Sequence, residues 1–423
     1  MKKKNIIIFS IVLTFIIIFI GVLLMDRKKQ IINNENKQHK YIKGDFNLNL
    51  IKIVNDKNNQ SNYLISPYSI EIALAMLKRG ANGTTKDEIT NVIGDRNIND
   101  VTVKKRVSVA NAAFIKNKYR NYVKKEYYDI LRNQYNSEIL YDEFKTPKVI
   151  NDWVNEKTNG MIPSILNNID ENFALGLANA LAIDVEWSSP FDCSDTHSEK
   201  FTMIDGKIMQ TEMMHKTLKY SGYKYFENIS AKGVIIPYKK YIKETGEEDY
   251  DNGNNLEFIA ILPNDDVDSY INNLTDNILD DLLSSAREVT NEFEIKLALP
   301  RFKYDYELED LKNVLKRLGI NEAFNPSTAD FTNMMSRNEE TGNLYVGEAI
   351  HKTHIDLNEK GTKAAAVTYF GMKTSGIILE KESVQLTFDK PFIYIIRDKK
   401  TNEMLFFGTI YEPNKWQGNT CKE

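Results

Sequence analysis

The chain has 423 residues, with 55 Lys and Arg against 59 Asp and Glu, which gives a formal net charge of -4. A nearly balanced charge provides no broad basic surface, so we expect no nucleic-acid partner. Pro and Gly are sparse and no repeat divides the chain, which predicts one large mixed domain after the N-terminal segment. Cys193 and Cys421 are the two cysteines; because they lie far apart in sequence, no disulfide framework is implied, and we interpret them as isolated, inert thiols.

Residues 6 to 25 form an apolar stretch that follows three lysines. Twenty helical residues rise about 30 Å, which is enough to cross the hydrocarbon core of a bilayer. Since no good cleavage site precedes the charged residues 26 to 29, we expect an uncleaved single-pass membrane helix, with a cleaved signal segment as the alternative. The domain is then expected on the extracellular side of the cell membrane, or secreted. We divide the chain into residues 1-45 (anchor or signal, and polar linker), 46-413 (folded domain) and 414-423 (tail).

The periodicity of the domain predicts helices in its first part and strands in its second. Helical patterns and start signals cover residues 69–79, 85–93, 122–135, 147–157 and 308–318. Strand patterns cover residues 107–115, 173–185, 256–262, 292–299, 345–357, 383–388, 392–397 and 404–411. This order predicts an α+β fold.

Motifs for catalysis or metal binding are missing from the sequence. We find no G-x-S-x-G elbow, phosphate-binding loop, H-E-x-x-H or zinc-type cysteine set. His351 and His354 are three apart in a predicted strand, which places them on opposite faces and disfavours a metal pair. The acidic residues 243 to 255 are interpreted as an exposed hairpin extension, with a calcium loop as the alternative. We therefore predict no enzyme activity, no cofactor and no metal.

Residues 359 to 368 read Glu-Lys-Gly-Thr-Lys-Ala-Ala-Ala-Val-Thr. Small side chains suit a segment that must slide between packed strands without clashing. Read with a period of two, one face carries Thr362, Ala364 and Ala366, while the other carries Lys363 and Ala365. The charge lies on one face only, which predicts a strand whose uncharged face can be buried.

This segment resembles the hinge of the reactive-centre loop of serpins, a family of serine protease inhibitors. The hinge residues are Glu359, Gly361, Thr362, Ala364, Ala365 and Ala366. Further matches, in the family's order, include residues 66–70, 299–302, 351–352 and 388–398. The resemblance covers about residues 46 to 413, and the number and order of its short motifs carry it. It implies a serpin fold of the bacterial type, with about nine helices, three β-sheets and an exposed loop.

The resemblance implies an inhibitor of serine-type endopeptidases, expected as a monomer, whose partner is the target protease. The protease would cut the loop, form an acyl-enzyme and be carried away as the hinge enters the central sheet. Sixteen extended residues span roughly 50 Å. The uncharged hinge face, expected to be buried only after cleavage, favours this reading. The alternatives are inhibition of papain-like cysteine peptidases and a non-inhibitory binding protein with the serpin fold.

The sequence predicts a window of five residues for the bond that the protease cuts, and not a single bond. Counting sixteen residues beyond Glu359 leads to Ser375, while Lys373 would suit a trypsin-like pocket and Met372 a subtilisin- or chymotrypsin-like one. The candidates are Met372, Lys373, Thr374, Ser375 and Gly376.

The resemblance also implies a buried polar cluster where the central sheet opens. Its members are Ser66, Ser69, Asn179 and His351. Two departures from the family stand out: Lys363 replaces an acidic residue, and residues 182 to 185 read Ala-Ile-Asp-Val. We expect Lys363 to lie on the outward face with little effect, and residues 182 to 185 to alter local packing.

Overall fold

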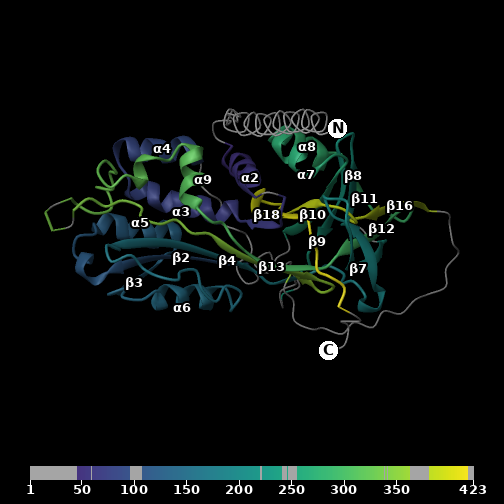
Figure 1. Cartoon of the computed structure of the whole chain (residues 1–423), viewed down its shortest axis with the longest axis horizontal. Coiled ribbons are helices and arrows are strands. Elements are labelled where there is room, and N and C mark those ends of the chain that lie inside the picture. The colour runs from purple at the N-terminus through teal and green to yellow at the C-terminus, as the bar shows by residue number, and fades with distance from the viewer. Residues whose placement is uncertain are drawn as a thin grey trace, which may run out of the picture. The chain divides into compact units, whose positions relative to one another are not determined.

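The computed structural model describes residues 45–58, 60–95, 107–219, 222–240, 245, 255–337, 339–340, 342–362 and 381–417 (Figure 1). The chain divides into two compact units, Met1–Ile42 and Lys43–Glu423, and every described residue belongs to the second. The apolar stretch at residues 6 to 25 therefore lies outside the described residues. Within the described ranges, no helix combines the length and the apolar character needed to cross a membrane.

Eight α-helices occur in the described part of the chain, against the nine or so that the resemblance implies. They are α2 (Phe46–Lys57), α3 (Pro67–Gly80), α4 (Gly83–Ile93), α5 (Lys125–Tyr135), α6 (Lys148–Lys157), α7 (Val267–Asn273), α8 (Asp276–Ser284) and α9 (Leu311–Leu318). The start of α3 is fixed by Ser66, whose side chain accepts a hydrogen bond from the Ser69 N–H, and by Pro67 in the first turn. This cap holds two residues of the predicted polar cluster in place.

The strands of the described ranges form four hydrogen-bonded arrays. The seven-stranded array has the order β1-β18-β17-β10-β9-β8-β11. Its strands are β1 (Tyr63–Ile65), β18 (Glu403–Ile410), β17 (Phe392–Asp398), β10 (Leu256–Pro263), β9 (Ala231–Pro237), β8 (Lys224–Glu227) and β11 (Arg287–Glu288). A second array has the order β16 (Glu382–Thr387), β12 (Phe293–Pro300), β7 (Ile208–Leu218) and β6 (Thr196–Thr202).

The other two arrays share one extended segment. One has the order β13 (Phe302–Glu307), β14 (Lys352–Asn358), β15 (Gly361–Thr362) and β5 (Val185–Glu186). The other has the order β3 (Glu138–Asp142), β2 (Val107–Lys116) and β4 (Leu175–Ile183). Because Asp184 alone separates β4 from β5, we treat the two arrays together as the central sheet, which brings the count to the three sheets expected.

Helices cover the β2–β4 part of the central sheet on both faces. Figure 1 shows α3 on one side of β2 and β4 and α6 on the other. Trp153 and Val154 of α6 pack with Phe114 and Ala180 in one apolar cluster. Ser69 of α3 contacts Asn179, which lies on the opposite face of β4 from Ala180. The helix that carries the cap and the strand that carries Asn179 are thereby brought together.

Candidate functional site

The hinge has already begun to join the central sheet in the uncut chain. Thr362 pairs with Leu357 of β14 on one side and with Val185 of β5 on the other. Its side chain is buried, and its hydroxyl lies 2.7 Å from the hydroxyl of Tyr238. The expectation that Thr362 becomes buried only after cleavage is therefore wrong. The reason is that Tyr238, which the hinge motif does not include, offers its hydroxyl a partner in the uncut state.

Gly361 is required by the geometry of this pairing. Its φ is +154°, and a Cβ built on it would lie 2.1 Å from the carbonyl oxygen of Val185. A side chain at this position would collide with backbone, which cannot move aside as a flexible side chain can. We call Gly361 and Thr362, held between β14 and β5, the seat.

A stacked pair of aromatic rings, Trp187 and Tyr238, lies next to the seat and is hydrogen-bonded to it and to the residues before it. Trp187 stacks on Tyr238 with ring centroids 4.9 Å apart and an interplanar angle of 3°. The indole N–H of Trp187 donates to the carbonyl oxygen of Asn358 at 2.9 Å, and its backbone N–H donates to that of Lys360 at 2.9 Å. Burial raises the pKa of Tyr238, so its hydroxyl stays neutral beside Thr362.

Glu359 anchors the chain just before the seat. One of its carboxylate oxygens accepts from the Thr196 hydroxyl at 2.7 Å, and the other lies 3.5 Å from Nε of Arg301. Its carbonyl oxygen accepts from the N–H of Phe191 at 2.8 Å. Arg301 also lies 3.4 Å from Glu212, so one guanidinium serves two buried carboxylates. A buried carboxylate with these partners is costly to displace, which fixes the turn between β14 and the seat.

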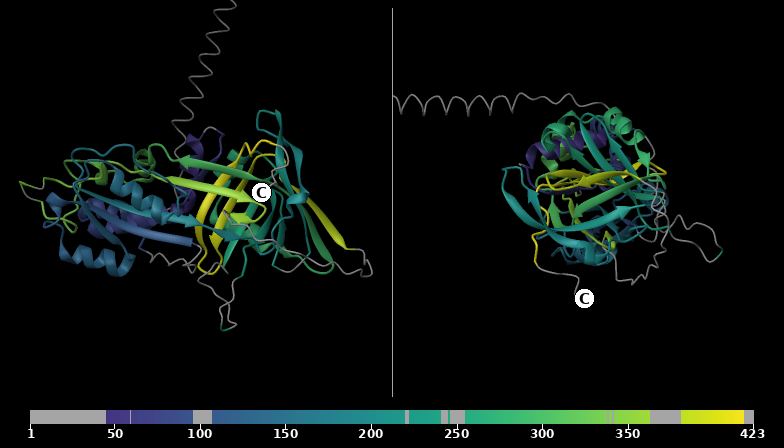
Figure 2. Two further views of the ribbon diagram at one scale, coloured as in Figure 1. Left: turned by 90° about the horizontal axis from the view of Figure 1, so that it is seen from below. Right: turned by 90° about the vertical axis from the view of Figure 1, so that its right-hand side faces the viewer.

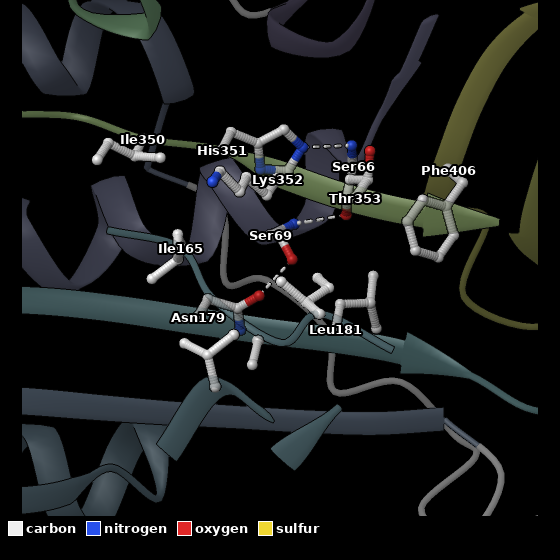
Figure 3. Close-up of a pocket in the computed structure, with 13 residues that line it drawn as sticks. Ser66, Ser69, Ile165, Asn179, Leu181, Ile350, His351, Lys352, Thr353 and Phe406 are labelled. Atoms are coloured by element: carbon white, nitrogen blue, oxygen red, sulfur yellow. Dashed lines mark hydrogen bonds between the residues drawn. The ribbon is translucent and has the colours of Figure 1, made fainter. Parts of the chain in front are cut away.

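Below the seat, β14 and β4 have no strand between them in the described part of the chain. There β14 pairs with β13 and β15, while β4 pairs with β2 alone. Figure 2 shows the lime-green arrow of β14 running beside the green arrow of β13. A cavity of about 30 Å³ lies between β4 and residues 350 to 353 (Figure 3). We call this region between the facing edges of β4 and β14 the slot.

The four predicted cluster residues meet at the slot cavity. The N–H of Ser66 donates to Nε2 of His351 at 2.9 Å, and the Ser69 hydroxyl donates to Oδ1 of Asn179 (Figure 3). Sequence reasoning missed Asn111, whose Oδ1 accepts from the Asn179 side-chain amide at 2.8 Å. The sequence feature that could have identified it is a single polar residue within the alanine-rich stretch 110 to 113.

His351 is held neutral by its surroundings, because burial lowers its pKa to about 4. Nε2 accepts the hydrogen bond from Ser66, which requires this unprotonated form. His354 is directed elsewhere, with Nδ1 2.6 Å from a carboxylate oxygen of Asp305. No group of three or more His, Cys, Asp or Glu suited to a metal ion occurs in the described ranges.

Cys193 is disulfide-bonded, so its interpretation as an isolated thiol is wrong. The sequence holds one other cysteine, Cys421, which lies outside the described residues. The described start of the tail lies against β7, where Lys415 pairs with Thr211 and the N–H of Trp416 donates to the carbonyl oxygen of Gln210 at 2.9 Å. Sequence separation was a poor guide because the fold, and not the chain order, sets which residues are near each other.

Several predicted residues lie outside the described residues. They are Lys363, which was expected on the outward face, the hinge residues Ala364, Ala365 and Ala366, the scissile-bond candidates Met372, Lys373, Thr374, Ser375 and Gly376, and most of the stretch at 243 to 255.

Comparison with known proteins gives the family. A family model described as "Serpin (serine protease inhibitor)" matches residues 42–413. The chain belongs to the serpin family. An uncharacterized serpin-like protein of Thermococcus kodakarensis is 30% identical, over 84% of this serpin and 82% of its own length. Leukocyte elastase inhibitor A of Mus musculus is 28% identical, over 87% and 97%.

Solved structures agree with this assignment. The crystal structure of a thermophilic serpin, tengpin, in the native state has a TM-score of 0.70 and 32% identity, over 89% of this serpin and 96% of that chain. The α+β serpin fold implied by the sequence motifs is thus confirmed.

Proposed function

We propose that this serpin inhibits serine-type endopeptidases as a suicide substrate, with the cut loop entering the slot as a new strand. The observation that carries the proposal is the seat. Gly361 and Thr362 already form ladder pairs with both neighbouring strands, directly above a slot without a strand among the described residues. The next residues of the hinge need only continue these two ladders.

Continuing the ladders places the small hinge residues over a buried face. In an antiparallel ladder, each step forward on the hinge is one step back on its neighbours. Ala364 would lie opposite Ile183 and Ile355, and all residues directly opposite one another share a face. Ala366 would lie opposite Leu181 and Thr353 in the same way. These four neighbours are buried, so a small uncharged side chain is what the slot can take.

The same registers lead Thr368 to the polar cluster. Its position lies opposite Asn179 on β4 and opposite His351 at the end of β14. A hydroxyl can both donate and accept hydrogen bonds, so Thr368 can join the network that Ser66 and Ser69 now complete. The cluster links β4 and the start of β14 by hydrogen bonds while no strand of the described ranges lies between them. The same polar groups can form hydrogen bonds to an inserted strand.

Trapping follows from where the protease is attached. Its serine attacks the carbonyl carbon of the residue before the cut bond, which leaves an ester between protease and hinge while the new amine end departs. As residues 363 onward enter the slot, both strand edges gain backbone hydrogen bonds, and the ester end is pulled along the sheet. Deacylation needs a water and an intact oxyanion hole, so a protease displaced and distorted first stays bound.

The choice of protease class depends on the loop. A papain-like cysteine peptidase would be held through a thioester by the same movement, so this remains the second candidate. A non-inhibitory binding role is disfavoured by the seat, because Thr362 is already accepted between the strands and, after Lys363, the hinge continues with three alanines.

We further propose that the domain acts as a monomer outside the cell, either anchored through residues 6 to 25 or secreted. The disulfide at Cys193 supports this placement, since disulfides persist in oxidising compartments.

The test is incubation of residues 43 to 423 with a panel of serine and cysteine peptidases. We expect a complex of summed mass that survives SDS with at least one serine peptidase, and a cut between residues 372 and 376 by mass spectrometry. Cleavage of the loop without a complex, and without a gain in heat stability, would overturn the proposal.

A further inference from the structure

Lys216 of β7 holds a loop that lies against the turn before the seat. Its Nζ donates to three neutral oxygens, which are the carbonyl oxygens of Ser189 and Pro190 and, at 2.8 Å, the hydroxyl of Ser189. The same Nζ lies 5.5 Å from the centroid of the Phe191 ring, a cation–π contact. An ammonium group has three N–H donors, so these oxygens use its full donor capacity. We call these contacts of Lys216 the latch.

The residues on either side of the latch hold the turn at residues 358 to 360. The N–H of Phe191 donates to the carbonyl oxygen of Glu359 at 2.8 Å, and the N–H of Trp187 donates to that of Lys360 at 2.9 Å. This turn joins β14 to the seat, so its position sets the register of the seat between the two neighbouring strands. The path from the ammonium group to the seat is therefore one short loop and two backbone hydrogen bonds.

The first half of the loop is attached in a different way. The N–H of Ser188 donates to the carbonyl oxygen of Pro237 at 3.1 Å, and the Ser188 hydroxyl lies 3.3 Å from the hydroxyl of Tyr223. Pro190 has no N–H with which to form a backbone hydrogen bond of its own, and its side chain is exposed. The latch therefore supplies the attachment of the second half of the loop to β7.

The surroundings of Lys216 make its charge depend on pH in the mildly alkaline range. Burial lowers its pKa to about 8, and the carboxylate of Asp192 opposes this shift by a smaller amount. β12 places an apolar side chain opposite Lys216, and Tyr223 stays neutral because burial raises its pKa. Further along the same face of β7, Glu212 is paired with Arg301. Above pH 8 the neutral amine keeps two N–H donors, so one of the three oxygens loses its hydrogen bond from Lys216.

We propose that Lys216 is a positioning residue for the hinge, because the latch fixes the loop that holds the turn and the seat in the register from which the hinge enters the slot. The inference rests on the proposed insertion of the hinge. A seat held in register can extend its two ladders without first having to find them. A loosened loop would therefore slow insertion, the step that competes with deacylation of the protease.

The first test follows the loop in the uncut protein and does not depend on insertion. Hydrogen exchange of the backbone amides is compared between the parent and Lys216→Met, which keeps an unbranched side chain and removes the three donors. Lys296→Met, which changes an exposed lysine of the adjacent strand β12, is the matched control. We expect exchange at Trp187 and Phe191 to be about fivefold faster in Lys216→Met and unchanged in the control. Equal exchange in the parent and Lys216→Met would overturn the inference.

The second test separates the charge of Lys216 from the packing of its side chain. Each protein is cut in the reactive-centre loop with excess peptidase at several pH values, and insertion is followed as the rate at which heat resistance appears. Comparing parent with Lys216→Met at each pH removes the pH dependence of the peptidase. We expect the parent to insert about threefold faster below pH 7, and this ratio to approach one above pH 9. The ratio of Lys216→Arg, which stays charged, to Lys216→Met should show no such fall.

The outcomes separate this inference from the proposed function. If the cut parent gains no heat resistance, insertion itself fails and the proposed function falls, whereas the exchange measurement still tests the latch. If the parent gains heat resistance but its ratio to Lys216→Met is one throughout, or does not fall with rising pH, the role of Lys216 is overturned. Ser189→Ala, which removes one of the three acceptors, should speed exchange by a smaller factor and gives a second reading if Lys216→Met does not fold.

Discussion

The seven-stranded sheet and the slot are built in opposite ways. In the sheet, β10 lies between β17 and β9, and both β10 and β18 are buried at every position. At the slot, β4 has a ladder partner on one side only among the described residues, and polar groups such as His351 and Asn179 line the cavity. Apolar burial is hard to rearrange, whereas hydrogen bonds can be exchanged for others of the same kind. The domain thus combines a rigid region, the seven-stranded sheet, with a region that can be rearranged, the slot.

The largest effect is expected from a charge in the seat, next to the slot. Thr362→Arg would force a guanidinium between β14 and β5, where the native hydroxyl is buried, at a cost of several kcal/mol. We expect the variant to be cut as a substrate, with at least about tenfold more inhibitor consumed per protease trapped. Thr362→Ser, which keeps the hydroxyl, is the control. Equal yields of SDS-resistant complex from the parent and the arginine variant would contradict insertion.

A cavity in the seven-stranded sheet should act on every state of the domain. Ile259 is fully buried in β10 and pairs with Ile395 and Ile235. Ile259→Ala should lower the free energy of unfolding by about 3 kcal/mol. Denaturant titration of uncut and loop-cut protein should show the same loss. A loss seen in one form only would mean that the two regions are not independent.

The slot should also be the more acid-sensitive region. The pKa of His351 falls from 6.5 to about 4 on folding, so the unfolded chain takes up its proton first as the pH falls. The stabilisation is complete above pH 6.5 and is lost between there and pH 4, up to about 3 kcal/mol.

The measurement is the difference in unfolding free energy between the parent and His351→Gln, taken at several pH values. The difference is needed because the pKa of Asp45, raised to about 6 by burial and by Asp276, changes stability in the opposite direction over the same range. A difference that does not vary with pH would rule out His351 as the source.

The smallest expected effect concerns the hydroxyl pair under the seat. Tyr238→Phe keeps the ring stacked on Trp187 and removes the bond to Thr362, which should cost about 1 kcal/mol. Thr362→Val removes the same bond from the other side. In a double-mutant cycle the two losses should not add. Fully additive losses would show that the hydroxyls do not interact.

Much of the fold was predictable, and the failures have local causes. Five helices were predicted close to their observed bounds, but α2 was missed because its apolar residues at 46, 48, 50, 51, 53 and 54 are too dense to show a helical period. β7 was missed because its methionines are not typical strand formers. The strand predicted over residues 345–357 begins only at Lys352, since residues 345 to 351 pair with no strand in the part of the chain that the structure describes.

Part of the candidate site was also predictable from the sequence, and part was not. The polar cluster could be predicted because its residues lie within recognisable motifs, and the structure brings all four to one cavity. The burial of Thr362 before cleavage could not be predicted, because it depends on Tyr238, which lies 124 residues away in the chain. Pairing between distant segments is a property of the folded chain that neither periodicity nor a short motif contains.

The disulfide at Cys193 has a consequence for the cut molecule. Within the chain the partner available to Cys193 is Cys421, and a cut between residues 372 and 376 places these two cysteines on different fragments. The cut inhibitor would then remain one covalent molecule. On a non-reducing gel the short C-terminal fragment should be absent, and it should appear when a thiol is added; its release without thiol would contradict this pairing. Trapping would leave protease, inhibitor and C-terminal fragment joined as a single three-part product.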